Sequence, residues 1–155
     1  MQDGAVLSSE RQLILFTLGK GSYGIPIEHV FEIKKMEEIT VVPKAPKFIE
    51  GVINMRGNVI PVIDLRKRFG MEKVEITKRT KIIIVEIGKR QFGVVVDAVA
   101  EVVTLAADQI EPSLPTVSGL KAEFINAIGK LNDKLIIILE ISKILQSTED
   151  IKVEV

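Results

Sequence analysis

The sequence predicts a mainly β protein built from two similar halves and folded as two small five-stranded barrels packed together. Three observations lead to this prediction: an internal repeat, short apolar runs with the length and composition of strands, and two runs that are apolar on both faces. Apolar residues make up 46% of the 155 residues, which is enough to bury a core of this kind.

The internal repeat runs in two registers. Residues 13–33 align with residues 82–102 at an offset of 69. After seven extra residues in the second half, residues 48–69 align with residues 124–145 at an offset of 76. The first register also brings prolines into step: Pro43 falls on Pro112, and Pro46 on Pro115. We therefore expect a duplication, with a first repeat over residues 13–69 and a second over 82–145.

In the first half, the apolar runs predict five strands, over residues 12–18, 22–26, 31–35, 51–56 and 58–64. The last two strands form a closing hairpin. In its turn, Gly57 takes a left-handed backbone conformation at the end of a bulged three-residue loop that starts at Met55. Asp64 then caps a short helix over residues 65–69, which Gly70 ends.

The second half repeats these elements, with strands expected over residues 80–87, 91–96, 99–104, 124–130 and 134–140, and a short helix over 141–146. Lys81–Ile87 and Lys134–Ile141 are apolar on both faces, so each needs cover on both sides, which the other barrel supplies. Residues 12–147 thus form one unit, with flexible tails at 1–11 and 148–155. Closed barrels remove exposed edges, but the pattern leaves open which strands the barrels exchange.

Composition narrows the function. Basic and acidic residues number 21 each, and this balance argues against binding of nucleic acid, which small proteins usually contact with a basic face. It has no cysteine and one histidine, His29, which falls on Ala98 in the repeat. The carboxylates of Asp97 and Glu101 are interpreted as solvated or turn residues. The sequence shows no metal, cofactor or catalytic motif, so we expect a protein that binds other proteins and is not an enzyme.

The closing hairpin of the first half differs from its counterpart. The first half carries Gly51, Asn54, Arg56 and Gly57, whereas the second carries Ala127, Lys130, Asn132 and Asp133. A turn can be built from either set, so the hairpin itself does not require Arg56. Two interpretations remain for this arginine: a solvated charge at a loop tip, or a residue that binds a partner.

Three motifs resemble those of one known family. The segment from Phe48 to Phe69 carries the pattern G-V-x-N-x-R-G-x-x-x-P-x-x-D-L, which resembles the signature of the CheW family of bacterial chemotaxis coupling proteins. Phe92–Asp97 resembles the family's G-x-x-V-D element, and Val30–Ile33 its V-x-E-I element. The resemblance extends from Gln12 to Leu145, which is nearly the whole chain.

The resemblance implies two packed SH3-like barrels and an adaptor that couples the histidine kinase CheA, through its regulatory domain, to the cytoplasmic tip of a methyl-accepting receptor. The positions it implicates in partner binding are Val30, Glu32, Gly51, Asn54, Arg56 and Gly57; Asn54, like Phe48 and Ile49, also has a purely structural interpretation. The alternatives are the coupling domain of a CheV-type protein, or a CheA regulatory domain, taken from a larger chain. No apolar run approaches the roughly 18 residues of a membrane helix, and no signal peptide is recognisable, so we expect a cytoplasmic protein recruited to receptor clusters.

Overall fold

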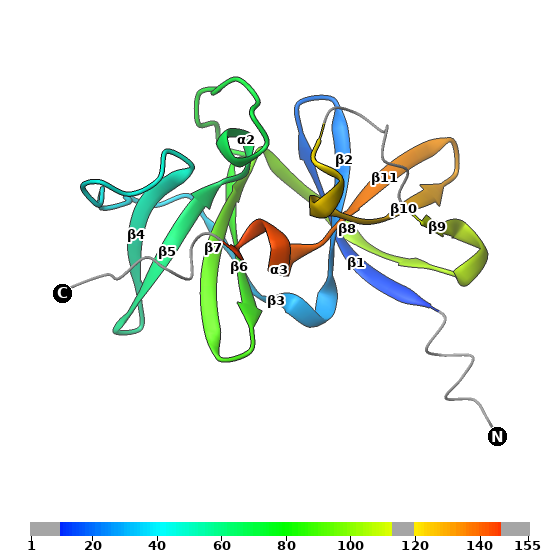
Figure 1. The fold of residues 1–155 in the computed structure, drawn as a ribbon, viewed down its shortest axis with the longest axis horizontal. Coiled ribbons are helices and arrows are strands. Elements are labelled where there is room, and N and C mark those ends of the chain that lie inside the picture. Colours follow the sequence, from blue (N-terminus) through cyan, green and yellow to red (C-terminus); the bar gives the residue numbers. More distant parts are fainter. Residues whose placement is uncertain (1–9, 113–119, 147–155) are drawn as a thin grey trace.

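The computed structural model describes residues 10–112 and 120–146, and within them the chain is mainly β (Figure 1). The strands of the first half are β1 (Arg11–Leu18), β2 (Gly21–Pro26), β3 (Val30–Lys35), β4 (Ile49–Met55) and β5 (Asn58–Asp64). Those of the second half are β6 (Lys81–Ile87), β7 (Arg90–Val96), β8 (Ala98–Leu105), β9 (Ile110–Pro112), β10 (Ile125–Leu131) and β11 (Lys134–Leu139). The helices are short: α2 (Leu65–Arg68), α3 (Ile141–Ile144), and the 3-10 turns η1 (Ile27–His29), η2 (Ala107–Gln109) and η3 (Ala122–Phe124).

The two halves exchange strands. One sheet has the order β8-β1-β2-β11-β10-β9, and the other has the order β3-β6-β7-β5-β4. Each sheet therefore combines the first hairpin of one half with the later strands of the other half. We call the first barrel A and the second barrel B; they lie side by side at the right and left of Figure 1. The sequence pattern left open which strands the barrels exchange: the structure shows that each half contributes its first hairpin to the other half's barrel.

The pairing follows the duplication. The pair Ile14↔Ile25 in β1–β2 corresponds at an offset of 69 to Ile83↔Val94 in β6–β7. In the same way, the closing hairpins pair as β4–β5 and β10–β11 with registers that correspond at an offset of 76. Even the parallel pairs between halves match, since β5 joins β7 as β11 joins β2. The predicted strands of the two halves thus occupy equivalent places.

The register departs from the repeat near the prolines. Thr40 bridges to Val52, whereas Glu111 pairs with Ile128, the residue equivalent to Val52. Thr40 and Glu111 are 71 residues apart, not 69, so the expectation that Pro43 and Pro112 occupy matching corners is wrong. Pro115 lies outside the described residues. The short strand β9, which the apolar runs did not predict, forms because this segment pairs with β10.

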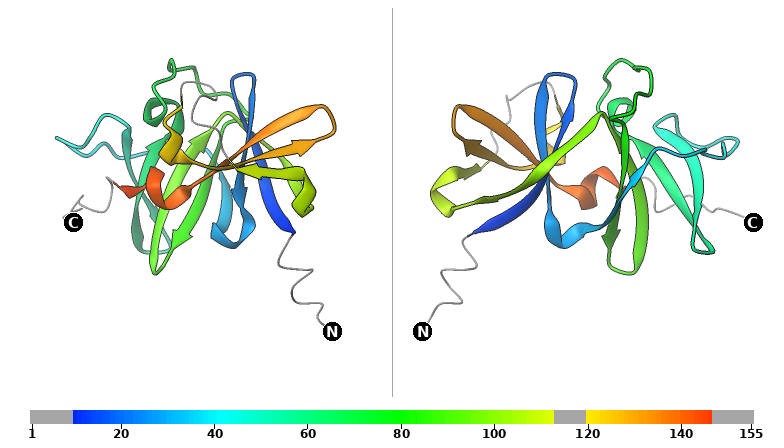
Figure 2. Two further views of the ribbon diagram at one scale, coloured as in Figure 1. Left: turned by 45° about the vertical axis from the view of Figure 1, so that its right-hand side comes forward. Right: turned by 180° about the vertical axis from the view of Figure 1, so that it is seen from behind.

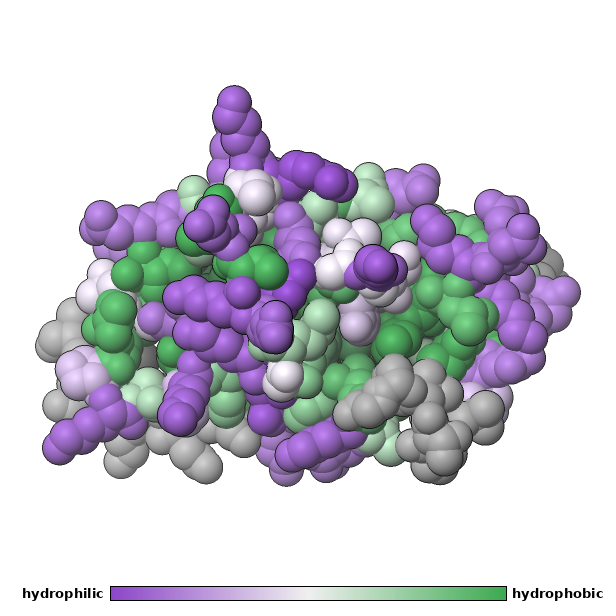
Figure 3. Space-filling model, turned by 90° about the horizontal axis from the view of Figure 1, so that it is seen from above, coloured by the Kyte–Doolittle hydropathy of each residue, from purple (hydrophilic) through white to green (hydrophobic). Residues whose placement is uncertain are grey.

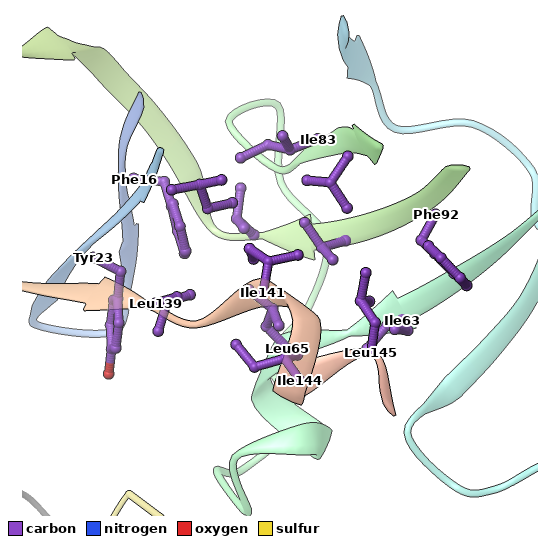
Figure 4. Packing of buried hydrophobic residues seen from close by; sticks show 14 of the residues in the cluster. Phe16, Tyr23, Ile63, Leu65, Ile83, Phe92, Leu139, Ile141, Ile144 and Leu145 are labelled. Atoms are coloured by element: carbon purple, nitrogen blue, oxygen red, sulfur yellow. The ribbon is translucent and has the colours of Figure 1, made fainter. Parts of the chain in front are cut away.

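Three apolar clusters hold the molecule together. Ile82 and Ile84 point into barrel B, while Ile83 and Val85 of the same strand point into a central cluster between the barrels (Figure 4). Ile136 and Ile138 similarly fill barrel A, and Leu139 and Ile141 join the central cluster. Each cluster contains residues from both halves. The prediction that these two-faced strands need cover from the other barrel is confirmed.

Candidate partner-binding surface

The β4–β5 turn is tighter than predicted. Met55 pairs directly with Asn58, which leaves only Arg56 and Gly57 in the loop, with φ angles of 51° and 88°. Two positive φ angles in a two-residue hairpin loop are typical of a mirror-image, type I′ turn. The predicted bulged three-residue loop is therefore wrong, because the strands keep their register up to the turn itself.

Two of the predicted site residues shape this turn. Asn54 Oδ1 accepts a hydrogen bond of 2.9 Å from the Gly57 backbone N–H. Gly57 is exposed, and a β-carbon there would meet no atom within 4 Å, so glycine is favoured by the backbone conformation and not by crowding. Both residues thereby position Arg56 at the tip.

Arg56 pairs with Glu32 across barrel B. Arg56 Nη1 lies 3.1 Å from Glu32 Oε1; the arginine side chain is 68% exposed and the glutamate side chain 30%. Glu32 lies on β3, and the hairpin of Arg56 contains β4, so the ion pair joins the two end strands of this sheet. Val30, also on β3, is half-buried against the central cluster. The structure thus brings Glu32 and Arg56 together, while Val30 lies on the same strand as Glu32, against the junction of the barrels.

Gly51 has a different role. It is buried, with a φ of 150°, and a β-carbon built on it would lie 2.0 Å from the backbone oxygen of Thr40. The close approach belongs to the Thr40–Val52 bridge that closes barrel B. Gly51 is therefore required by the fold, and its role in partner binding stays a prediction.

Three exposed apolar residues beside this region were not predicted from the sequence. Phe31 and Ile33 on β3 are 48% and 40% exposed, and Val102 on β8 is 49% exposed. Ile33 pairs with Ile83 and Val102 with Ile14, and both partners belong to the central cluster. We call Phe31, Ile33 and Val102 the apolar strip; β3 and β8 flank the junction of the barrels (Figure 2, right). The repeat was the available signal, since Ile33 and Val102 are 69 residues apart.

A charged cluster around Asp97 was also not predicted from the sequence. Asp97 accepts hydrogen bonds from Arg66 Nε at 2.9 Å, from Arg66 Nη2 at 2.6 Å and from the Gly19 N–H at 2.7 Å. These bonds, above all those from Arg66, hold the pKa of Asp97 below its ordinary value, and raise the pKa of Arg66. Asp97 is thus not a solvated carboxylate: it ties α2 of the first half to β7 of the second.

A second carboxylate of this region has its pKa shifted the other way. Asp64 Oδ1 accepts a hydrogen bond of 2.9 Å from the Arg66 N–H, which confirms the predicted helix cap. Burial raises the pKa of Asp64, and the nearby charge of Glu50 raises it further. Glu50 Oε1 is itself enclosed by protein, and Lys67 Nζ lies 2.6 Å from it.

The described part of the chain offers no group of three or more His, Cys, Asp or Glu side chains suited to holding a metal ion. Within the same residues, no helix has the length and apolar character needed to cross a membrane. The arrangement that the structure does show is an exposed ion pair and an apolar strip carried on two rigid barrels. The fold and this surface define a protein-binding module.

Comparison with known proteins identifies the family. The model of the CheW-like domain matches residues 12–149. The chemotaxis protein CheW of Klebsiella aerogenes is 37% identical over 139 residues, which cover 90% of this chain and 84% of that protein. The chemotaxis protein CheW of Helicobacter pylori is 36% identical over 87% of this chain and 81% of its own length. The chain belongs to the CheW-like family and is a chemotaxis adaptor.

A solved structure shares the fold. The scaffolding protein TtCheW of Thermoanaerobacter tengcongensis is 45% identical, with a TM-score of 0.79 over 84% of this chain and 88% of that one. Because these relatives are matched along most of their own length and are themselves CheW proteins, a CheV-type or kinase regulatory domain is not the favoured alternative.

Proposed function

We propose that this adaptor couples methyl-accepting chemoreceptors to the histidine kinase CheA by protein binding alone, without catalysis or a cofactor. Membership of a family of chemotaxis scaffold proteins supports this proposal. It acts in the cytoplasm, where receptor clusters at the membrane recruit it through the tips of the receptors.

The observation that carries the proposal is the difference between the two barrel ends. Barrel B bears the Arg56–Glu32 ion pair at its seam. The equivalent positions in barrel A are Asn132 and Glu101, which offer no such pair of opposite charges. Two barrels with the same fold and different ends suit an adaptor that binds two different partners at once. We assign the Arg56 end to the regulatory domain of the kinase.

The apolar strip suits the second partner. An amphipathic helix binds by laying apolar side chains spaced one turn apart against an apolar surface. Phe31, Ile33 and Val102 offer such a surface beside the barrel junction, and buried neighbours on β1 and β6 hold them in place. We assign this strip to the α-helical tip of the receptor.

Calorimetric titrations with the kinase regulatory domain and with a receptor-tip fragment test both assignments. Arg56→Ala is expected to weaken binding of the kinase domain more than binding of the receptor tip. Val102→Asp is expected to weaken binding of the receptor tip more. A matched control is Val41→Asp, which changes an exposed valine away from the strip. If neither variant changes either affinity, the proposal fails; if one variant weakens both partners equally, the assignment of separate surfaces fails.

A further inference from the structure

The duplication creates two equivalent clefts, one beside each barrel. In barrel B the cleft is lined by Glu50, Asp64, Thr80, Val95 and Asp97. Every one of these positions has its repeat equivalent in a cleft beside barrel A, which is lined by Asn126, Glu140, Arg11, Pro26 and Glu28. The two clefts differ in how much space is left open: the free volume is about 90 Å³ in the cleft of barrel B and about 630 Å³ in the cleft of barrel A.

The chain itself fills the barrel B cleft. Lys73, Val74, Glu75 and Ile76, from the linker between α2 and β6, complete its lining. Arg66, at the start of α2, places its guanidinium on Asp97, and Lys67 places its ammonium on Glu50. Figure 3, which views the molecule from above, shows apolar patches lying among hydrophilic ones on its left side, where barrel B lies. The occupant is thus a polypeptide segment that supplies cations and aliphatic side chains.

The barrel A cleft keeps two of the three carboxylate positions and lacks the arginine. Asn126 replaces Glu50, and Lys143, the equivalent of Lys67, does not line the cleft. Glu28 stands where Asp97 stands in barrel B, but the position of Arg66 is taken by Ser142. Glu140 accepts hydrogen bonds from Asn126 Nδ2 at 2.8 Å and from Ser142 Oγ at 3.1 Å.

One further carboxylate, two basic side chains and three apolar residues also line this cleft. Glu10 adds a third carboxylate, while Arg11 donates to Asn126 and His29 is the remaining basic side chain. Pro26, Ile27 and Leu139 provide the apolar lining. Carboxylates therefore outnumber the permanent cations three to one along this cleft.

We propose that the barrel A cleft binds an extended, basic segment of a partner protein. An arginine or lysine of that segment pairs with Glu28 as Arg66 pairs with Asp97, and an aliphatic side chain rests on Ile27 and Leu139. Charge complementarity selects the basic segment, and the filled cleft of barrel B provides the template. The cleft lies between the start of β1, η1 and the residues that join β11 to α3. This proposal does not rest on the functions assigned to the Arg56 end.

The test uses the full chain and a labelled peptide with the sequence of residues 66–76, which carries the arginine and the aliphatic side chains that fill the other cleft. Fluorescence anisotropy should show saturable binding that weakens as salt rises. Glu28→Gln is expected to weaken binding about fivefold, and the double variant Glu10→Gln, Glu28→Gln about tenfold or more. Glu38→Gln, an exposed glutamate of the other barrel's end, should leave binding unchanged.

Three results would overturn the proposal. The first is the absence of saturable binding, with a Kd above about 1 mM. The second is binding that Glu28→Gln and Glu38→Gln change equally. The third is binding that appears only after residues 147–155 are removed, since the chain itself would then be the occupant. Unchanged affinity for the kinase domain and the receptor tip in Glu28→Gln separates this site from the proposed coupling surface.

Discussion

Arg56, in the turn that follows the end strand β4, and Glu32, on the opposite end strand β3, form an ion pair of 3.1 Å that joins the two edges of the barrel B sheet. The pair is largely open to solvent, and exposed ion pairs contribute at most about 1 kcal/mol to stability. The same exposure leaves the guanidinium accessible to a partner. The relationship therefore matters more for presenting Arg56 than for holding the barrel closed.

Arg56→Ala should separate binding from folding. We expect the free energy of unfolding to change by no more than about 0.5 kcal/mol. The arginine side chain is exposed, and arginine and alanine are equally disfavoured by the positive φ at position 56. Binding of a partner should weaken by about 1–3 kcal/mol, as is common for interface arginines. A denaturant midpoint and a titration measure the two effects. A loss of stability with unchanged binding would make Arg56 a structural residue.

Gly51→Ala and Gly57→Ala should differ in severity. At Gly51 the new β-carbon would collide with the Thr40 backbone, so we expect a loss of about 3 kcal/mol or more. At Gly57 the space is open and only the positive φ opposes a side chain, so the loss should be about 1–2 kcal/mol. Chemical denaturation measures both. Equal losses of stability in the two variants would contradict the prediction, because the Thr40 backbone would then have moved to accommodate the new β-carbon at position 51.

Asp97→Asn should lower stability and flatten its response to acid. The pKa of Asp97 is depressed in the folded state, so its ionised form stabilises the fold above the ordinary value of 3.8. That contribution is lost as the pH falls through the depressed pKa. Because the Arg66–Asp97 pair is partly exposed, we expect Asp97→Asn to lower the free energy of unfolding by about 1–3 kcal/mol at pH 7. Near pH 3 the difference from the wild-type protein should be smaller.

Urea unfolding at several pH values measures this difference, and Asp133→Asn, at an exposed hairpin tip, is the matched control. If Asp97→Asn and the unchanged chain lose stability in parallel on acidification, the Arg66–Asp97 pair is not the source of the acid sensitivity.

Asp64→Asn should have the opposite sign. Burial and Glu50 raise the pKa of Asp64 in the folded state, so ionised Asp64 costs folding free energy at neutral pH. Asparagine caps a helix about as well as aspartate, so the variant should keep the cap and gain up to about 1 kcal/mol at pH 7. The gain should vanish below pH 3.8, where the carboxyl is protonated in both states. Thermal melts at several pH values measure this gain. Asp64→Ala removes the cap as well as the charge, so it should be less stable than Asp64→Asn by about 1 kcal/mol.

Much of the fold was already present in local sequence patterns. The offsets of 69 and 76 predicted equivalent strands, Asp64 marked the start of a helix, and the two-faced apolar run at Lys81–Ile87 predicted a covered strand. These features are visible in sequence because they depend on neighbours a few residues apart or on a comparison of the chain with itself. The repeat even carried the equivalence of Ile33 and Val102, although their exposure did not follow from it.

Tertiary structure alone decided which hairpin joins which barrel. The apolar pattern of β1–β2 fits either sheet, because equivalent strands of a duplicated chain offer the same alternation of inward and outward side chains. Contacts that depend on this choice were therefore hidden, among them the Arg66–Asp97 bridge between halves and the open cleft at Glu28. The Arg56–Glu32 pair was hidden for a related reason, because it forms only when a sheet curves until its two end strands meet.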